Sequence, residues 1–267
     1  MSEVEHFGFD VQPAVVKIGL HLVWAALLHK HLDFGYEAQQ LFEKCEPPLI
    51  FMGRENIPDS GPCIITPNHL CWPGFQAWWL AAGISSVTPV EIHWVMSAAW
   101  TTPNTWKAWW WTPLTTWAFQ AIANIYGFTT MPPMPPDPRQ VAWRVKSVRT
   151  VLRFVRSKLN QKVQYQKVQS GPVIGLVPEG QDMPGGRISM PPKGVGRFIG
   201  QMVGMGLKIT PVGVFIGDRQ LCINFGRPYY PEIGTNQSKD DLDEKISRQI
   251  MEHIASLVPE NLRGEFL

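Results

Sequence analysis

The sequence predicts an α/β fold, a single domain with a central mixed sheet flanked by helices and an amphipathic helix at its N-terminal end. Two apolar runs, Cys63 to Ile65 and Val173 to Val177, indicate buried strands, and each is soon followed by a proline. Segments with helical spacing alternate with such runs, which is typical of α/β folds. The 267 residues are 45% hydrophobic, enough for one substantial core. We expect an N-terminal helical region at residues 1–44 and the α/β domain at residues 45–267.

The N-terminal region is dominated by a helical stretch, Val11 to Leu32. Its apolar part, Val15 to Leu28, is broken by Lys17 and His21 and is shorter than the ~20 residues that a membrane span requires. The pattern therefore predicts an amphipathic helix that lies on an apolar surface or on a bilayer. His21 is either a ligand or a histidine that only fills space at the surface or in the core.

The next segment places a histidine and a glutamate at the ends of two strands. Leu49 to Gly53 indicates a strand, and the run from Cys63 ends in Thr66-Pro67-Asn68-His69 before an apolar helical segment, Phe75 to Ala82. The run from Val173 ends in Pro178-Glu179-Gly180. Because ligands of open α/β sheets bind outside the carboxyl ends of strands, we expect His69 and Glu179 to share one edge of the sheet. The alternative for His69 is a strand-end histidine with a purely structural role.

Tryptophan is unusually abundant, with ten of the twelve lying between Trp72 and Trp117. After a strand at Ile92 to Ser97, the segment Trp100 to Tyr126 is interrupted by Pro103 and Pro113, which predicts two short helices with exposed apolar faces. Tryptophan concentrates at membrane–water boundaries, so this segment is a candidate bilayer contact. The alternative is a tryptophan-rich core.

The second half of the chain begins with a proline-rich loop, Met131 to Pro138, and a basic amphipathic helix, Arg139 to Lys158. The basic face of this helix is either simply solvated or a site for anionic headgroups. A flexible loop at Gln181 to Ile188 follows the Glu179 strand. The remaining elements are a strand end at Phe128 to Met131, a helix at Arg197 to Gly206, strands at Lys208 to Phe215 and Gln220 to Phe225, and a helix at Lys239 to Leu257.

Charge and cysteine content exclude some classes of function. A net charge of +2 gives no support for a nucleic-acid partner. The four cysteines lack metal-ligand spacing and indicate free thiols in a reducing compartment. Cys71 lies two residues from His69, so a thiol nucleophile is a second possibility for the site.

Four segments in order resemble the motifs of the glycerolipid acyltransferase family, which includes lysophosphatidate and glycerol-3-phosphate acyltransferases and tafazzin-like enzymes. Asn68-His69 resembles the first motif, Asn-His-x4-Asp, and Val177-Pro178-Glu179-Gly180 resembles the third. Pro192-Lys193-Gly194 resembles the segment after the third motif, and Ile209 to Gly213 resembles the fourth. The resemblance covers roughly residues 45 to 230.

The chain departs from this pattern at three points. Gly74 stands where the first motif has its aspartate, and the arginine of the second motif is not evident near Gly127 to Met131. The third motif continues with Gln181-Asp182 instead of Thr-Arg, and Arg187 is a candidate replacement for that cation. In the family the aspartate orients the catalytic imidazole. Either another group orients His69 here, such as Glu179, Asp182, a backbone carbonyl or the substrate, or the chain is an impaired relative.

The resemblance implies an O-acyltransferase of phospholipid biosynthesis that moves a fatty acyl group from acyl-CoA or acyl carrier protein to a lysophospholipid or a similar hydroxyl or amine acceptor. It implies His69 as general base, with no metal or cofactor, and a peripheral or monotopic location at the cytoplasmic face of a membrane. The expected substrate-binding residues are Asn68, Glu179, Gly180, Arg187 and Lys193. The alternative is a catalytically impaired relative that binds lipids or acyl groups.

Overall fold

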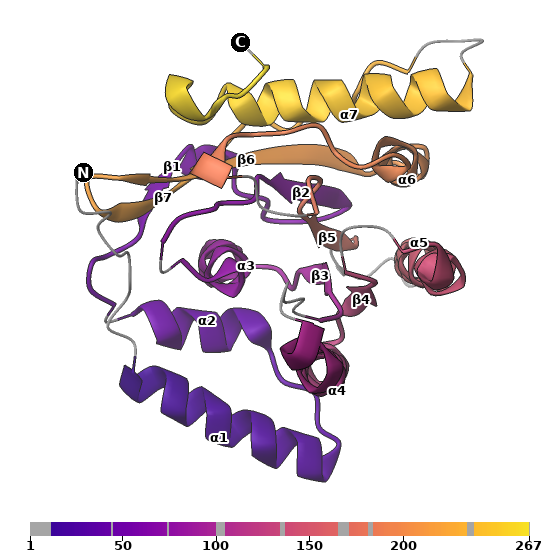
Figure 1. Cartoon of the computed structure of the whole chain (residues 1–267). Coiled ribbons are helices and arrows are strands. Elements are labelled where there is room, and N and C mark those ends of the chain that lie inside the picture. Colours follow the sequence, from indigo (N-terminus) through magenta and orange to yellow (C-terminus); the bar gives the residue numbers. More distant parts are fainter. Residues whose placement is uncertain are drawn as a thin grey trace.

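The structure is a computed structural model that describes residues 12–43, 45–73, 75–99, 105–133, 137–164, 171–180, 184–233 and 238–266. Its centre is a seven-stranded sheet in the order β1-β7-β6-β2-β5-β3-β4 (Figure 1). Only β6 and β7 pair antiparallel; the other pairs are parallel, which confirms the predicted mixed sheet. The strands are β1 Ile50–Met52, β2 Cys63–Pro67, β3 His93–Ser97, β4 Thr129–Met131, β5 Val173–Leu176, β6 Lys208–Gly217 and β7 Gln220–Phe225.

Helices cover both faces of this sheet (Figure 1). The helices α5, α6 and α7 pack on one face. On the other face α3 lies next to the sheet, with α2 beyond it and α1 beyond α2, and α4 lies beside β4. The helices are α1 Gln12–Leu28, α2 Phe34–Phe42, α3 Ala77–Val87, α4 Thr105–Tyr126, α5 Val141–Gln164, α6 Val195–Val203 and α7 Lys239–Ala255.

The core lies on both sides of the central strands, β2 and β5, whose residues are all buried. Successive side chains of a strand point to opposite faces. Ile64 accordingly joins the cluster under α5, α6 and α7, while its neighbour Ile65 joins the cluster under α2 and α3. Strands covered on both faces read as continuous apolar runs, which is why the sequence identifies these two clearly.

A buried carboxylate joins α6 to α7. Asp243 of α7 accepts hydrogen bonds from the backbone N–H groups of Gly194, at 2.6 Å, and Arg197, at 2.8 Å. Gly194 adopts a left-handed conformation, φ 101°, that favours glycine. The first N–H groups of a helix have no partner within the helix and carry a partial positive charge, so Asp243 satisfies and neutralises the start of α6.

The prediction of two short helices in the tryptophan-rich segment is wrong, because α4 is one 22-residue helix with Pro113 inside it. A proline removes one backbone hydrogen bond from the helix. Nearby threonine hydroxyls donate to carbonyl groups of the preceding turn, Thr115 to Trp111 at 3.0 Å and Thr116 to Thr112 at 2.7 Å. Residues 100–104, which belong to the same prediction, lie outside the described residues.

The helix α2 has no counterpart among the predicted elements. It begins at an N-cap, Asp33, whose carboxylate accepts a hydrogen bond from the backbone N–H of Tyr36 at 3.1 Å. The carboxylate of Glu37 is buried between helices, where it accepts a hydrogen bond from the Tyr126 hydroxyl and contacts Nδ1 of His21 at 3.2 Å. In this structure His21 therefore links α1 to α2.

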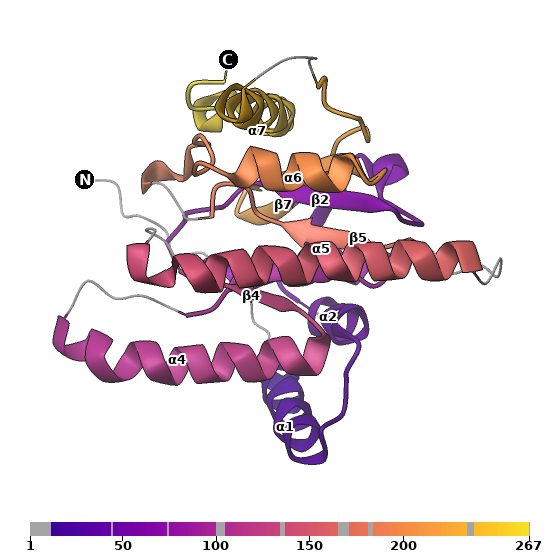
Figure 2. The ribbon, with the colours of Figure 1, turned by 90° about the vertical axis from the view of Figure 1, so that its right-hand side faces the viewer.

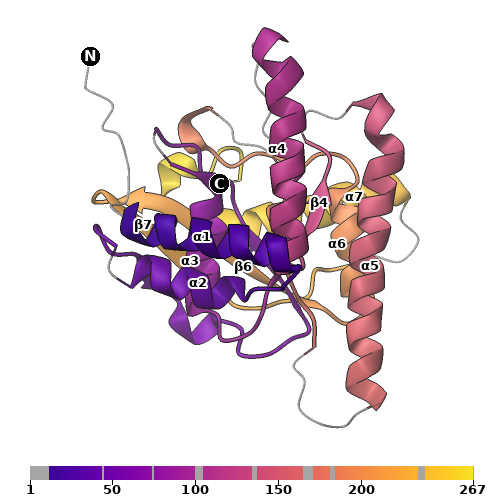
Figure 3. The same cartoon turned by 90° about the horizontal axis from the view of Figure 1, so that it is seen from below.

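The helices α1 and α4 meet near their C-terminal ends (Figure 3), where Ala25 is buried against Ile125 and Tyr126. Both helices expose large apolar side chains on their outer sides, as the sequence predicts. None of the described helices has both the length and the apolar character that crossing a bilayer requires. The exposed apolar residues are Val15, Val16, Leu20, Val23, Trp24, Leu27 and Leu28 on α1, and Trp106, Trp110, Leu114 and Trp117 on α4.

Candidate active site

The loops after β2 and β5 meet at one edge of the sheet. These two strands are parallel neighbours, with Cys63 beside Val173 and Ile65 beside Gly175. Their carboxyl ends therefore lie together, as the sequence predicts. The carboxylate of Glu179 accepts a hydrogen bond from the backbone N–H of His69 at 2.6 Å, although the two residues are 110 positions apart. This contact defines the candidate active site.

Glu179 is only 2% exposed and links the His69 loop to a third segment. Its other oxygen, Oε1, accepts from the backbone N–H of Ser189 at 2.8 Å and lies 3.4 Å from the Ser189 hydroxyl. Burial raises the pKa of Glu179 to about 7, and the N–H donors of His69 and Ser189 offset part of that rise. Burial thus disfavours the charged form of Glu179, and its hydrogen bonds offset this effect only in part.

The segment around Ser189 is confined between the His69 loop and the C-terminal end of the chain. Gly186 has a φ of +67°, and a Cβ there would lie 3.1 Å from the carbonyl oxygen of Cys71. Ile188 donates its N–H to the carbonyl of Leu262 at 2.8 Å. The His69 loop, the segment around Ser189 and the C-terminal end are therefore packed together, although they are distant in sequence.

Asn68 lies at the site, but its side chain bonds to the backbone of the sheet. The amide is fully buried; its nitrogen donates to the carbonyl of Val214 at 2.9 Å, and its oxygen accepts from the N–H of Val214 at 2.6 Å. Both polar groups of the side-chain amide pair with β6, which gives Asn68 a structural role at the end of β2.

The two predicted anion-binding residues have different surroundings. Arg187 is exposed and lies between Gly186 and Ile188, in the segment that is held against the His69 loop. Lys193 instead pairs with Asp240 of α7 at 2.8 Å, and both side chains are largely exposed. Arg187 is therefore the better placed of the two for a ligand at this edge.

The remaining predicted residues are only partly described. Gly180 follows Glu179 with a φ of +68°, a left-handed conformation that turns the chain directly after the carboxylate. Gly74 and the positions of Gln181 and Asp182 lie outside the described residues. Ser189 was not predicted, because it follows Glu179 by ten residues and belongs to no recognisable motif.

The cysteines give limited support to thiol chemistry. Cys45, Cys63 and Cys222 are buried, and burial raises the pKa of Cys63 to about 12, which disfavours the reactive thiolate. Cys71 is partly buried and remains the cysteine nearest His69 in sequence. Within the described residues, no group of three or more His, Cys, Asp or Glu side chains is arranged to hold a metal ion.

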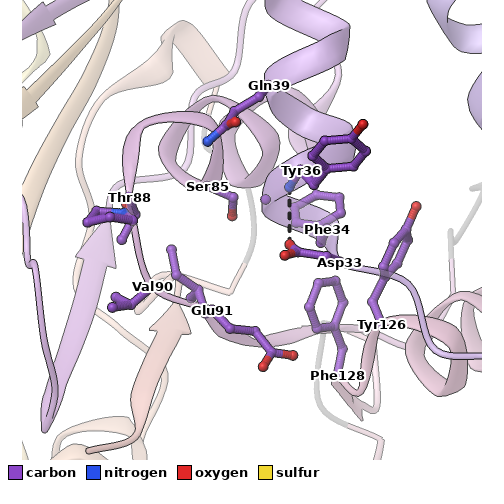
Figure 4. Close-up of a pocket in the computed structure, with 13 residues that line it drawn as sticks. Asp33, Phe34, Tyr36, Gln39, Ser85, Thr88, Val90, Glu91, Tyr126 and Phe128 are labelled. Atoms are coloured by element: carbon purple, nitrogen blue, oxygen red, sulfur yellow. Dashed lines mark hydrogen bonds between the residues drawn. The ribbon is translucent and has the colours of Figure 1, made fainter. Parts of the chain in front are cut away.

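A cavity of about 180 Å³ lies at the opposite edge of the sheet (Figure 4). It is bounded by the start of α2, the end of α3 and the residues that precede β3, with the carboxylates of Asp33 and Glu91 near the rings of Phe34 and Phe128. Since β3 is parallel to β5, its beginning lies at the edge away from His69. This cavity is therefore separate from the candidate active site.

No protein-family model and no curated protein matches the chain. Among solved structures, the chain is similar to the 1-acyl-sn-glycerophosphate (LPA) acyltransferase PlsC from Thermotoga maritima. The TM-score is 0.41 with 16% sequence identity, over 84% of this chain and 77% of that chain. A likeness of this strength carries no argument about activity.

Proposed function

We propose that this protein is an acyltransferase that moves a fatty acyl group from an acyl thioester, acyl-CoA or acyl carrier protein, to a lysophospholipid or a similar hydroxyl or amine acceptor. The ordered motif-like segments support this proposal. The observation that carries it is the hydrogen bond from the backbone N–H of His69 to Glu179, which joins two of those segments at one sheet edge.

In the proposed reaction, His69 is the general base. Its imidazole takes the proton of the acceptor hydroxyl while the hydroxyl oxygen attacks the thioester carbonyl. The carbon–sulfur bond then breaks, and the proton passes from the imidazolium to the departing thiolate. An ester replaces the thioester, and no oxidant or metal is needed for the balance of atoms and electrons.

Glu179 is a positioning residue in this scheme. Its two carboxylate oxygens accept hydrogen bonds from the backbone of His69 and Ser189. A small displacement of a catalytic base costs a large factor in rate, since the base has to lie within hydrogen-bonding reach of the proton. Glu179 therefore acts through the main chain that carries the imidazole, a different route from that of an aspartate bonded to the ring.

The proposal includes contact with a membrane surface through α1 and α4. The side chains of Trp106 and Trp117 are 76% and 71% exposed. Large apolar side chains that cluster on a surface indicate contact with a membrane or with another protein. Tryptophan favours the boundary between headgroups and acyl chains. The four free cysteines fit the reducing, cytoplasmic side of such a membrane.

One sequence feature favours a second candidate function, a lipid- or acyl-binding protein without turnover. Gly74 offers no carboxylate where the resembled motif has aspartate. Removing the partner of a catalytic histidine lowers turnover by about 10⁴-fold in serine proteases. A protein of this kind would bind acyl-CoA or lysophospholipid without transferring the acyl group.

The test is a purified-protein assay with acyl-CoA or acyl carrier protein as donor and a panel of lysophospholipid, glycerol phosphate and amine acceptors. We expect His69→Ala to lower the transfer rate by about 10²–10⁴-fold, the contribution of general-base catalysis. His253→Ala, in α7, is the matched control and should keep native activity. Full activity of His69→Ala would exclude the mechanism, and binding without transfer by the native protein would favour the second candidate.

A further inference from the structure

The helix α5 carries an unusual concentration of positive charge. Its 24 residues include seven lysines and arginines and no acidic residue. The whole chain has a formal net charge of only +2, so the rest of the chain has a net charge of −5. The basic face of this helix is either simply solvated or a site for anions, and several of its cations are exposed in the structure.

Four of these cations form a straight line on the outer side of α5, which we call the cationic row: Lys146, Arg149, Arg153 and Arg156. At 100° per residue they fall within an arc of about 80°, and at 1.5 Å per residue the row is about 15 Å long. All four are exposed, whereas Ser147, Val151 and Val155 face the core. No member of the row has an ion pair within the described residues.

Exposed apolar side chains accompany the cationic row on α5 and on the parallel helix α4. On α5 itself, Val141 and Val145, near its N-terminal end, are 57% and 42% exposed. The helix α4 runs nearly parallel to α5 on the same side of the molecule (Figure 2), and it exposes Trp110 and Trp117. A line of cations with exposed valines on the same helix, and exposed tryptophans on the parallel helix, matches the chemistry of a bilayer surface that contains anionic lipids.

The direction of the two helices relates this surface to the candidate active site. The helix α4 begins eight residues after the end of β3, and α5 begins ten residues after the end of β4. These strands run parallel to β5 and β2, so both helices begin at the sheet edge that carries His69. A bilayer lying along α4 and α5 would therefore extend to that edge.

We propose that the cationic row is a docking surface for anionic phospholipid headgroups, which makes membrane binding selective for anionic bilayers. The inference deepens the proposed function, on which it rests, by naming the lipid surface that the protein recognises. An acidic protein would satisfy the same charges, but it would leave the exposed valines of α5 and tryptophans of α4 without a role. Each lysine or arginine near an anionic membrane strengthens binding by about fivefold, and salt weakens it.

The test is vesicle co-sedimentation at low and high salt, with phosphatidylcholine alone or with ~30% phosphatidylglycerol, a fraction that gives a substantial negative surface potential. The test variant is K146Q/R149Q/R153Q/R156Q. The matched control removes four exposed cations from other elements, R54Q/R227Q/K239Q/R248Q. We expect the test variant to bind the anionic vesicles roughly 600-fold more weakly than the native protein, about fivefold for each of the four cations. Its binding to phosphatidylcholine alone should not change, and the control should behave as the native protein. Thermal unfolding checks that both variants are folded.

Native-like binding of the row variant to anionic vesicles would overturn the proposal and would direct attention to an acidic protein partner. An equal loss in the control variant would also overturn it, because net charge alone would then explain the binding. Acyl transfer between detergent-dispersed substrates is measured in parallel. If the native protein shows no transfer while only the row variant loses anionic binding, the proposed function fails and the docking surface stands.

Discussion

Two buried carboxylates, Glu179 and Asp243, make the same kind of contact in two regions of the molecule. Each accepts hydrogen bonds from two backbone N–H groups, and each is less than 5% exposed. Asp243 holds two donors of one element, the start of α6. Glu179 holds donors from two separate loops, those of His69 and Ser189.

The two sites differ in the secondary structure to which the donor N–H groups belong. The N–H groups at the start of α6 carry the partial positive charge of a helix end, which favours an anion there. The donors of His69 and Ser189 belong to irregular loops, and burial raises the pKa of Glu179 to about 7. Asp243 thus stabilises the start of a helix, whereas Glu179 positions the backbone of His69. No helix end helps to stabilise the negative charge of Glu179.

Replacement of Glu179 should have the largest effect on activity. Glu179→Ala leaves the backbone N–H groups of His69 and Ser189 without their acceptor, so we expect acyl transfer to fall by about 100-fold or more as the base loses its position. Asp243→Ala is the control and should keep native activity per folded molecule. Transfer rates are measured at equal concentrations of folded protein for both variants. Near-native turnover by Glu179→Ala would show that Glu179, like Asp243, has no role in positioning the base.

The pH dependence of stability should also differ between native protein and Glu179→Gln. The folded pKa of Glu179, about 7, lies above the reference value of 4.5, so the folded protein binds this proton more tightly than the unfolded chain. Its contribution to the free energy of unfolding is therefore present below pH ~4.5 and is lost as pH rises to ~7, a change of about 3 kcal/mol. Urea unfolding across this range should show that fall in the native protein and a smaller one in Glu179→Gln. Identical pH profiles would argue against the raised pKa.

Replacement of Asp243 should affect stability alone. Asp243→Ala leaves two backbone N–H groups at the start of α6 without an acceptor, which costs about 2–4 kcal/mol of unfolding free energy. Urea unfolding monitored by circular dichroism measures the loss, with Asp240→Ala as a control in the exposed first turn of α7. A loss below about 0.5 kcal/mol would mean that water replaces the carboxylate at no cost.

The smallest effect is expected for Ser189→Ala. The Ser189 hydroxyl lies 3.4 Å from Glu179, at the limit of a hydrogen bond, and the backbone N–H that makes the shorter bond remains. We expect a change of less than about 0.5 kcal/mol in stability and about twofold in rate. A tenfold loss of rate with unchanged stability would show that the hydroxyl itself contacts a substrate.

The sequence predicts the elements that carry strong local patterns. The strands β2 and β5 lie within two residues of their predicted ends, because central strands covered on both faces are apolar throughout. The edge shared by His69 and Glu179 follows from the same parallel strands. The tryptophan-rich segment is predicted as two helices because proline usually ends a helix, yet α4 continues through Pro113, which no local pattern encodes. The role of Ser189 likewise depends on a loop that the C-terminal residues hold in place, so only the folded chain shows it.

Asn68 has a consequence for how the chain leaves the sheet. The last register pair of β2 and β6 is Pro67 with Val212, yet the Asn68 side chain pairs with both backbone groups of Val214. A side-chain amide thus imitates one more peptide unit of the strand, while the main chain is free to turn at the next residue. Aspartate lacks the donor for this imitation, and glutamine is one carbon too long. Asparagine therefore suits the position directly before the histidine, because its side chain continues the hydrogen bonding of β2 for one more residue while the main chain leaves the sheet.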